Sequence, residues 1–325
     1  MNLLVTGGAG FIGSHFCNLI APQIKKLVIL DKLTYAADLS YLDCSYLFIV
    51  GDICDQALVR KTLYKHEIDT IVHFAAESHV DRSIQSAAAF VKTNIVGTQV
   101  LIDEFKDHNP DGCVHKRFIH VSTDEVYGVA EEGTSFTEST PYAPNSPYAA
   151  SKAASDLMVR SYYKTHNFPA VITHCSNNFG PHQADEKLIP TVIRSLVNNK
   201  PIPVYGSGKQ VRDWISVHDH CTALMTVLYK GRLGETYNIG GCNELTNIDL
   251  VHLLCDEYDN FTNTMGSRDL IEHVTDRLGH DARYSVDIAK IRNELKWMST
   301  RSFNSEINCT IEYYFKKYSA RLTVP

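Results

Sequence analysis

The chain has 325 residues, of which 44% are hydrophobic and 21% charged, and its formal net charge at pH 7 is −6. This composition is typical of a globular enzyme, and the length is sufficient for two lobes. The negative balance, with no basic block to offset it, argues against a nucleic-acid partner. No apolar run is long enough to cross a bilayer, so a membrane protein is not expected.

The first residues, Met1–Val5, lead directly into an apolar strand and carry no basic region or cleavage site. A cytoplasmic location is therefore expected. Nine cysteines are scattered along the chain without a C-x-x-C pair, among them Cys17, Cys113, Cys175 and Cys242. This pattern favours reduced thiols over disulfides, and it predicts no metal site. We interpret His218 and His220 as surface or helix-start residues rather than as metal ligands.

Six short apolar runs with helical stretches between them dominate the first half of the sequence. Runs of this length that are apolar throughout are typical of strands buried on both faces. The alternation predicts an α/β fold, a doubly wound parallel Rossmann sheet that occupies residues 1–175. The expected strands are Leu3–Thr6, Leu27–Leu30, Leu47–Val50, Thr70–Ala75, Phe118–Ser122 and Val171–Cys175.

A glycine-rich segment, Thr6–Gly13, lies between the first expected strand and the helix that follows it. Gly7, Gly10 and Gly13 allow a tight turn and a close approach of the backbone to a pyrophosphate, at a helix N-terminus that favours negative charge. A glycine triplet alone is a weak signal, but the strand before it and the helix after it supply the required context. The segment therefore predicts a dinucleotide site.

The residues at the ends of the next two strands refine this prediction. Asp31 is placed to bind the ribose hydroxyls, and a carboxylate there repels a 2′-phosphate, which favours NAD over NADP. Lys32 beside it weakens this preference slightly. Asp52 and Ile53 are placed to meet the adenine, although a turn-capping role for Asp52 explains its position equally well.

The segment Ser122–Gly128 follows another expected strand, at the sheet edge where open α/β sheets bind their ligands. Thr123 is placed to hold a substrate hydroxyl. Asp124 and Glu125 add an acid and a base that hydride transfer alone does not require. An Asp-Glu pair is usually solvated loop charge, but its position beside Thr123 favours a catalytic role.

Tyr148 and Lys152 form a Y-x-x-x-K pattern, which also occurs at Tyr205/Lys209 and Tyr313/Lys317. Ser146 and Pro147 precede Tyr148 as a helix start, so the two side chains share one face of a helix. Lys152 is then expected to lower the pKa of the Tyr148 phenol and to bind the cofactor ribose, which makes Tyr148 a base.

Beyond residue 175 prolines and glycines divide the chain into shorter elements. We expect residues 176–325 to form mainly a second, smaller substrate-binding lobe, with residues 213–243 returning to the first lobe. Helices are predicted over 220–230 and, at the end of the chain, over 307–320.

These motifs resemble the extended short-chain dehydrogenase/reductase family, and within it the nucleotide-sugar 4,6-dehydratases that act on dTDP-glucose. The resemblance extends from the first strand to about Arg283. Its most specific segments are Ala75–Ser83, Ser122–Gly128, Ser176–Gly180, Gly208–Trp214 and Asp276–Asp281.

The resemblance implies two sets of binding residues in addition to the glycines. The expected NAD contacts are Phe11, Ile12, Asp31, Lys32, Thr34, Asp52, Ile53, Ala75, Ala76, Thr93, Tyr148, Lys152 and Asn178. The expected substrate contacts are Ser78, His79, Thr123, Asn177, Lys187, Leu188, Pro203, Tyr205, Arg212, Asn247, Arg277 and His280. Leu278 and Phe179 depart from the family pattern, which usually has proline and often tyrosine there.

The resemblance also implies a reaction, as in rhamnose and other deoxysugar biosynthesis. Tyr148 would deprotonate the C4 hydroxyl of a nucleotide-diphosphate glucose during its oxidation by NAD. Glu125 would then remove the C5 proton, and Asp124 would protonate the departing C6 hydroxyl. A homodimer through helices near Gly97–His108 and Tyr148–His166 is expected as well.

Three alternatives stay open from the residues. An NAD-dependent nucleotide-sugar C4-epimerase would share Thr123, Tyr148 and Lys152 but would not need Asp124 and Glu125. A catalytically silent NAD-binding protein would lack at least one of Tyr148, Lys152, Asp124 and Glu125. The motifs do not separate dTDP-glucose from UDP-glucose, because one methyl group is worth only about 1–3 kcal/mol in a pocket.

Overall fold

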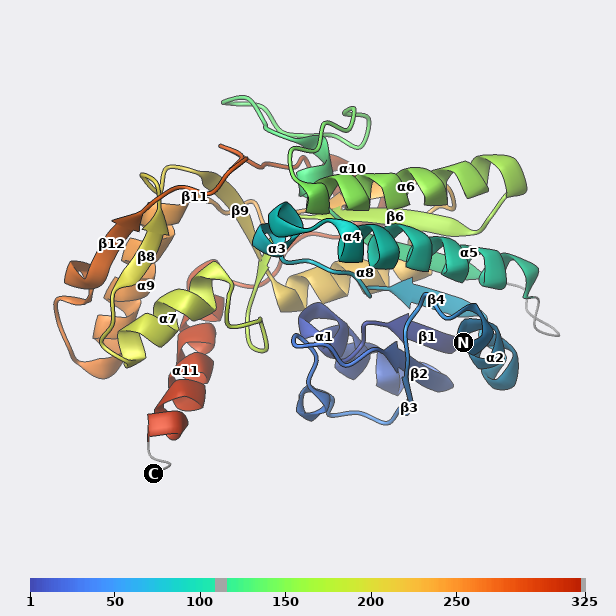
Figure 1. Cartoon of the computed structure of the whole chain (residues 1–325), viewed down its shortest axis with the longest axis horizontal. Coiled ribbons are helices and arrows are strands. Elements are labelled where there is room, and N and C mark those ends of the chain that lie inside the picture. Colours follow the sequence, from blue (N-terminus) through green and yellow to red (C-terminus); the bar gives the residue numbers. More distant parts are fainter. Residues whose placement is uncertain (109–115, 323–325) are drawn as a thin grey trace.

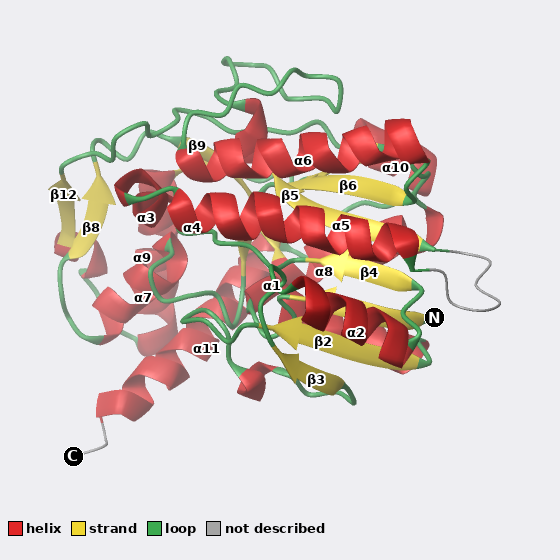
Figure 2. Ribbon diagram, turned by 45° about the vertical axis from the view of Figure 1, so that its right-hand side comes forward, coloured by secondary structure: helices red, strands yellow, loops and turns green. Residues whose placement is uncertain are grey.

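The computed structural model describes residues 1–108 and 116–322, so Cys113 lies outside the described residues. Its largest element is a seven-stranded parallel sheet with the strand order β10-β6-β5-β4-β1-β2-β3 (Figures 1 and 2). The expected doubly wound α/β fold is confirmed. The strands are β1 (Asn2–Thr6), β2 (Lys26–Asp31), β3 (Leu47–Val50), β4 (Thr70–His73), β5 (Arg117–Thr123), β6 (Ala170–Cys175) and β10 (Thr236–Ile239).

Alternation along the strands explains the two helical layers. Leu3 and Val5 of β1 pack into a core with α1 and α8, whereas Leu4 between them packs into a core with α2, α5 and α6. This is the period of two that places neighbouring side chains on opposite faces of a sheet. The helices are α1 (Phe11–Ile20), α2 (Gln56–His66), α5 (Thr98–Asp107), α6 (Pro147–His166), α8 (Val217–Lys230) and α10 (Ala289–Leu295).

One expectation about the sheet was wrong. Leu47 and Val50 of β3 are exposed, so this strand is not buried on both faces. The reason is its position, because β3 is the edge strand beyond β2.

A second core lies beyond the carboxyl ends of the strands (Figure 1). It is formed by α7 (Leu188–Val197), α9 (Asn247–Thr262) and α11 (Phe303–Leu322), with β8 (Ile202–Tyr205) paired to β12 (Ile271–Val274). A three-stranded sheet of β7 (Asn177–Phe179), β9 (Val211–Ser216) and β11 (Glu244–Thr246) lies between this core and the large sheet. The predicted helices over 220–230 and 307–320 are present as α8 and α11.

Short helical segments complete the chain. They are η1 (Ala21–Gln23), η2 (Leu39–Tyr41), α3 (Val80–Gln85), α4 (Ala88–Phe90), the π-helical η3 (Val91–Gly97), η4 (Asp124–Tyr127) and η5 (Ser267–Leu270). Among residues 1–108 and 116–322, no helix combines the length and apolar character that a membrane span requires.

Candidate active site

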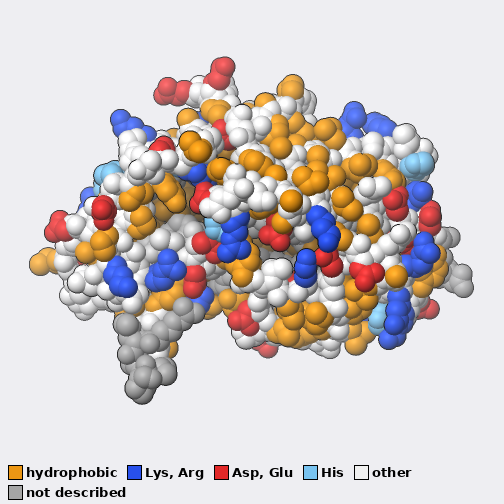
Figure 3. Space-filling view, in the orientation of Figure 1, with side chains coloured by type: hydrophobic (Ala, Val, Ile, Leu, Met, Phe, Trp, Pro, Cys, Tyr) orange, Lys and Arg blue, Asp and Glu red, His pale blue; other side chains and the backbone are white. Residues whose placement is uncertain are grey.

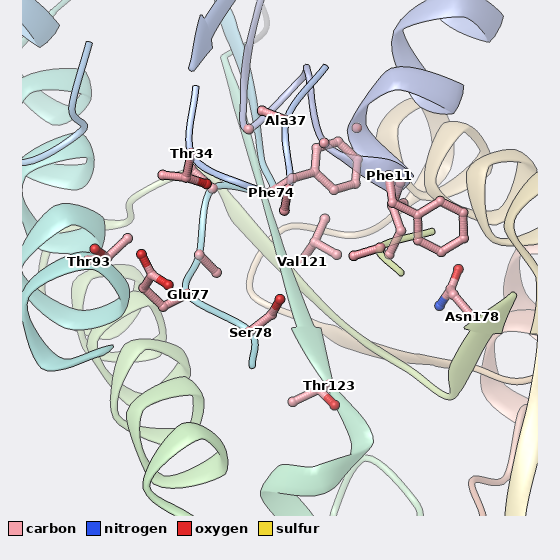
Figure 4. Close-up of a pocket in the computed structure, with 18 of the residues that line it drawn as sticks. Phe11, Thr34, Ala37, Phe74, Glu77, Ser78, Thr93, Val121, Thr123 and Asn178 are labelled. Carbon is pink, nitrogen blue, oxygen red and sulfur yellow. The ribbon is translucent and has the colours of Figure 1, made fainter. Parts of the chain in front are cut away.

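A cavity of about 330 Å³ opens where β1, β2, β4, β5 and β6 end. Figure 4 shows its lining, with Phe11 at the start of α1, Thr123 at the end of β5 and Asn178 on β7 facing a common space. Ligands of open α/β sheets bind at this edge. The structure brings together here Gly7, Gly10, Phe11, Ile12, Gly13, Asp31, Lys32, Thr34, Asp52, Ile53, Ala75, Ala76, Thr93, Tyr148, Lys152 and Asn178.

The glycine-rich turn is shaped by steric constraint. Gly7 has a φ of +72°, and a Cβ on it would lie 2.6 Å from the backbone N of Ala75. A Cβ on Gly13 would lie 2.2 Å from the carbonyl O of Gly7. Gly10 precedes α1 without a side-chain cap, so backbone N–H groups at the start of this helix are available to an anion.

Asp31 holds this turn to the end of β2. Its Oδ2 accepts a hydrogen bond from Ala9 N at 3.0 Å, and its Oδ1 accepts one from Leu33 N at 2.8 Å. At the rim, Lys32 Nζ lies 2.8 Å from Asp52 Oδ2. The cation beside Asp31 is thus already paired, which reduces its attraction for a 2′-phosphate.

The Tyr148–Lys152 pair lies on one face of α6, as the sequence predicts. Ser146 caps this helix by accepting from Ala149 N at 3.1 Å, and Pro147 is its first residue. Lys152 is buried, and its Nζ donates to the carbonyl O of Val121 at 2.8 Å. Burial lowers the pKa of Lys152, while the charge of Asp156 raises it.

The expected lowering of the Tyr148 pKa was wrong. The pKa is raised well above its usual value by the enclosure of the phenol and by the negative charges of Glu125 and Asp124. A hydrogen bond with Thr123 opposes this shift. Lys152 is not among its main influences.

Asp124 and Glu125 start η4, directly after Thr123. Thr123 Oγ1 donates to Asp124 Oδ1 at 3.3 Å and accepts from Glu125 N at the same distance. Burial, together with the charges of Glu125 and Asp213, raises the pKa of Asp124 well above its usual range. Burial also raises the pKa of Glu125, against the opposing positive charges of Lys187, Arg212 and Arg277.

These surroundings separate the two neighbouring carboxyl groups. The pKa of Asp124 is raised the more strongly, which suits it to donate a proton, whereas three cations oppose the upward shift at Glu125, which suits it to accept one. Two carboxyl groups whose environments differ in this way form an acid and base pair.

The expected substrate residues are divided between the cavity and the smaller lobe. Ser78, Thr123, Asn177 and Lys187 line the cavity, and Lys187 Nζ donates to Ser78 O at 3.2 Å. Arg212 is buried and donates to the carbonyl groups of Val211 and Asp281. The lining does not include His79, Leu188, Pro203, Tyr205, Arg212, Asn247, Arg277 or His280.

Some of those outer residues lie near one another. The rings of Tyr205 and His280 are 6.3 Å apart, and Arg277 pairs with Asp81 at 3.8 Å. Of the two departures from the family pattern, Leu278, which follows Arg277 in the sequence, is exposed, and Phe179 is buried in the second core.

Sequence reasoning missed part of the lining. Glu77 and Ser176 belong to segments that already carried the resemblance, so they could have been found. Gln183, Ala184 and Glu186 lie in a loop before α7 without a recognisable pattern. The other missed residues are Leu30, Ala36, Ala37, Gly51, Phe74, Val121, Ser122 and Cys175.

Metal chemistry has no candidate site in the described part of the chain, where no group of three His, Cys, Asp or Glu residues could hold an ion. His220 is buried on α8, and its Nδ1 bonds Asn178 Oδ1 at 2.8 Å. The eight cysteines that the structure describes are free thiols.

The model of one protein family, described as GDP-mannose 4,6 dehydratase, matches residues 4–310. The chain belongs to this family. It is 49% identical to a dTDP-glucose 4,6-dehydratase of Xanthomonas campestris, over 96% of this chain and 92% of that protein.

Solved structures agree with this assignment. The dTDP-glucose 4,6-dehydratase DesIV of Streptomyces venezuelae, solved with NAD and dTDP bound, is 44% identical with a TM-score of 0.90, and 98% of each chain is covered. A UDP-glucose 4-epimerase of Thermotoga maritima, solved with UDP-glucose, superimposes almost as well, with a TM-score of 0.89. Its identity is only 26%, over 98% of this chain and 99% of that one. The fold is therefore shared with epimerases, and the residues of the site must separate the two reactions.

Proposed function

We propose that this chain is an NAD-dependent dTDP-glucose 4,6-dehydratase, a hydro-lyase that converts its substrate to the 4-keto-6-deoxy sugar and water. The observation that carries the proposal is the pair Asp124 and Glu125, which lies in the same cavity as Tyr148 and Lys152. Burial raises the pKa of both carboxyl groups, but three positive charges oppose the shift at Glu125, whereas the charges of Glu125 and Asp213 add to it at Asp124. The relatives that act on dTDP-glucose support dTDP over UDP as the nucleotide.

The residues present fit NAD. The turn at Gly7 and Gly13 leaves no room for side chains, the start of α1 is uncapped, and Asp31 stands at the end of β2. We propose that α1 binds the diphosphate, that Asp31 and the adjoining rim bind the adenosine half, and that Lys152 binds the second ribose. When bound, NAD accepts a hydride from the sugar C4 and later returns it to C6.

The protein's own part in oxidation is proton transfer at the C4 hydroxyl. Thr123 holds this hydroxyl beside Tyr148, whose phenolate removes its proton. Because burial and the neighbouring carboxyl groups raise the pKa of the phenol, positive charge is needed to form the phenolate. Lys152 and the cationic ring of oxidised NAD are the groups that can supply it.

Elimination then uses the carboxyl pair. A ketone at C4 acidifies the hydrogen on C5, and Glu125 removes it. Asp124, whose pKa is raised well above its usual range by burial and nearby negative charge, donates its proton to the C6 oxygen, which leaves as water. Glu125 returns its proton to C5 as C6 is reduced. The proton that Tyr148 took from the C4 hydroxyl then passes to Asp124, directly or through solvent, which restores both groups to their starting states.

A C4-epimerase needs the oxidation half of this machinery only, and a buried acid and base beside the C5–C6 bond would serve no step. The same residues argue against a silent NAD-binding protein, because Thr123, Asp124, Glu125, Tyr148 and Lys152 are all present and face one cavity.

Association and cellular context extend the proposal. We propose a homodimer through α5 and α6, because hydrophobic side chains gather over α4, α5 and α6 (Figure 3). Val91, Val96 and Leu157 are exposed there.

The free thiols support a reducing compartment such as the cytoplasm. A product of this kind is suited to the biosynthesis of rhamnose and other deoxysugars. We also propose that residues 1–175 form the NAD-binding lobe, joined by part of 213–243, and that the remainder forms mainly the sugar-nucleotide lobe.

The deciding experiment is parallel incubation with dTDP-glucose and UDP-glucose, followed by mass spectrometry. We expect a product lighter by one water, formed faster from dTDP-glucose, and no product from the Tyr148→Phe variant. A product of unchanged mass with inverted C4 would instead establish the epimerase. Equal rates from both donors would overturn the assignment of the nucleotide and leave that of the reaction.

A further inference from the structure

A cluster of buried polar side chains lies beneath the cavity, between α6 and the sheet. We name it the Asp156 cluster; it comprises Ser122, Tyr127, Asp156 and two histidines, His120 and His174, all buried. Asp156 Oδ2 accepts from Ser122 Oγ at 2.9 Å and from His174 Nε2 at 3.0 Å. Asp156 Oδ1 lies 3.1 Å from His120 Nε2.

The cluster connects the elements that carry the reacting groups. Asp156 is one helical turn beyond Lys152 on α6, and Ser122 directly precedes Thr123 on β5. From β6, His174 Nδ1 bonds the hydroxyl of Tyr127 at 2.7 Å. Tyr127 ends η4, the short helix that begins with Asp124 and Glu125. A chain of contacts thus joins α6, which carries Tyr148 and Lys152, to η4, which carries Asp124 and Glu125.

Packing alone does not account for this arrangement. The far half of α6 is held by apolar contacts of Val159, Met158 and Tyr162 in the core that it shares with α5. A buried carboxylate costs free energy, and apolar side chains of similar volume often stabilise a core as well or better. The fully buried polar contacts of Asp156 lie in the half of α6 nearer the cavity, whereas Tyr162 in the far half donates from its hydroxyl to Asp103 Oδ1 only in a partly buried position. This placement points to a task other than stability.

Resting on the function proposed above, we propose that Asp156 is a positioning residue for the active site. Its contacts set the place of α6 relative to β5 and η4, and its negative charge keeps the Lys152 ammonium group charged. It acts through these neighbours and touches neither substrate nor cofactor.

The electrostatic surroundings support both parts of the proposal. Burial disfavours the charge of Asp156, but His120 and His174 outweigh it and hold the pKa below its usual range. Burial and the charge of Lys152 lower the pKa of His120 to about 4, so His120 is neutral at pH 7. Burial lowers the pKa of Lys152, and Asp156 and Cys175 raise it.

Other groups around Lys152 do not replace Asp156. His73 on β4 is buried, and burial holds its pKa well below the usual value, so it is neutral. Burial raises the pKa of the Cys175 thiol on β6 to about 12, and that of the Tyr148 phenol well above 10, so both are neutral near pH 7. Because these groups are neutral, the nearby negative charge that raises the pKa of Lys152 is that of Asp156.

The test is Asp156→Asn, which keeps the shape and removes the charge. Lys152 is active as the ammonium, so its contribution is lost as pH rises through its pKa. Without Asp156 that pKa falls, and the alkaline limb of kcat with dTDP-glucose should move to lower pH. We also expect kcat at pH 7.5 to fall about ten- to hundredfold, the size expected for misplaced reacting groups, with little change in KM.

Glu104→Gln is the matched control. Glu104 is another buried helical carboxylate, and it holds α5 to α2 through Arg60 and Gln56. It should lower thermal stability without moving the pH profile. Asp156→Glu restores the charge at a shifted position, so the alkaline limb should return to its wild-type place while kcat stays reduced. If circular dichroism shows that Asp156→Asn is unfolded, Asp156→Glu becomes the test. A wild-type kcat in Asp156→Glu would then overturn the proposal.

The result that overturns the proposal directly is a folded Asp156→Asn protein with the wild-type kcat and pH profile. Failure of the proposed function would be seen separately, as no loss of water from dTDP-glucose with wild-type protein. In that case the NAD retained through gel filtration at rising pH replaces kcat. Retention should end at lower pH in Asp156→Asn than in the wild type, and equal retention would overturn the proposal.

Discussion

At the scale of single residues, the environment of two adjacent side chains separates dehydration from simple oxidation. Burial raises the pKa of both Asp124 and Glu125. At Asp124 the negative charges of Glu125 and Asp213 add to this shift and Arg212 opposes it, whereas at Glu125 Lys187, Arg212 and Arg277 oppose it and Asp281 adds to it. Their roles follow from those neighbours rather than from residue type. An Asp-Glu pair on an open loop would titrate normally and could not divide the work of acid and base.

Replacement of Glu125 by glutamine tests this division. The change keeps the size of the side chain and removes its ability to accept the C5 proton. Oxidation at C4 should continue, so we expect reduced cofactor to accumulate in a single turnover while water loss slows about 10²- to 10⁴-fold. Absorbance at 340 nm and mass spectrometry measure the two steps. Glu132→Gln, an exposed loop substitution, should behave as the wild type, and rapid water loss in Glu125→Gln would assign the base to another group.

The reacting residues could be proposed from the sequence because each belongs to a pattern with a position in the fold. The motif of Thr123, Asp124 and Glu125 follows a recognisable strand, and Tyr148 follows a recognisable helix cap. Their protonation could not be predicted in the same way. The shared helix face of Tyr148 and Lys152 gives no information on the contact of Lys152 with Val121 O, or on the carboxyl groups around the phenol.

At the scale of elements, the glycine-rich turn joins local conformation to cofactor binding. Gly13 packs against the carbonyl of Gly7, whereas a Cβ on Gly10 would meet only an ordinary contact of 3.4 Å with the same atom. Gly7 and Gly13 therefore close the turn, and Gly10 faces the cavity.

Alanine at these two positions should consequently produce different defects. Gly13→Ala forces the turn apart, so we expect a loss of about 1–3 kcal/mol in the free energy of unfolding, together with weak NAD binding. Gly10→Ala should stay near wild-type stability and lose affinity for NAD only. Denaturant unfolding and NAD titration measure the two effects. Equal destabilisation by both variants would show that the turn closes differently.

Periodicity identified the first six strands of the large sheet because each is a short apolar run between helical segments. Periodicity could not predict the pairing of β10 with β6, because the paired residues are about 64 positions apart in the sequence, as in Thr236 with Ile172. The parallel pair of β8 and β12 likewise depends on distant segments. Neither has a local signal, because such pairing is decided by how the packed helices bring the strands together.

At the scale of the whole molecule, the cavity lies between a sheet that supplies the cofactor turn and a smaller lobe that supplies Lys187 and Asn178. The helices α5 and α6 lie on the outside of the sheet, so an interface there would leave the cavity open. It would also lie against the helix that carries Tyr148, Lys152 and Asp156. Association through this face could therefore stabilise the catalytic helix without blocking the substrate.

Charged substitutions on that face provide the test. Burying a glutamate in an apolar interface without a partner is costly, so Val96→Glu and Leu157→Glu should convert a particle of two 36.5 kDa chains into single chains. Light scattering during gel filtration measures the mass. Val50→Glu is the control, because Val50 is at least as exposed as Val96 and Leu157 but lies on the edge strand β3. A wild-type mass of one chain would show that there is no dimer. Dissociation by Val50→Glu alone would place the interface at β3 instead. If the dimer supports α6, the dissociated variants should also lose kcat while their cavity residues remain unchanged.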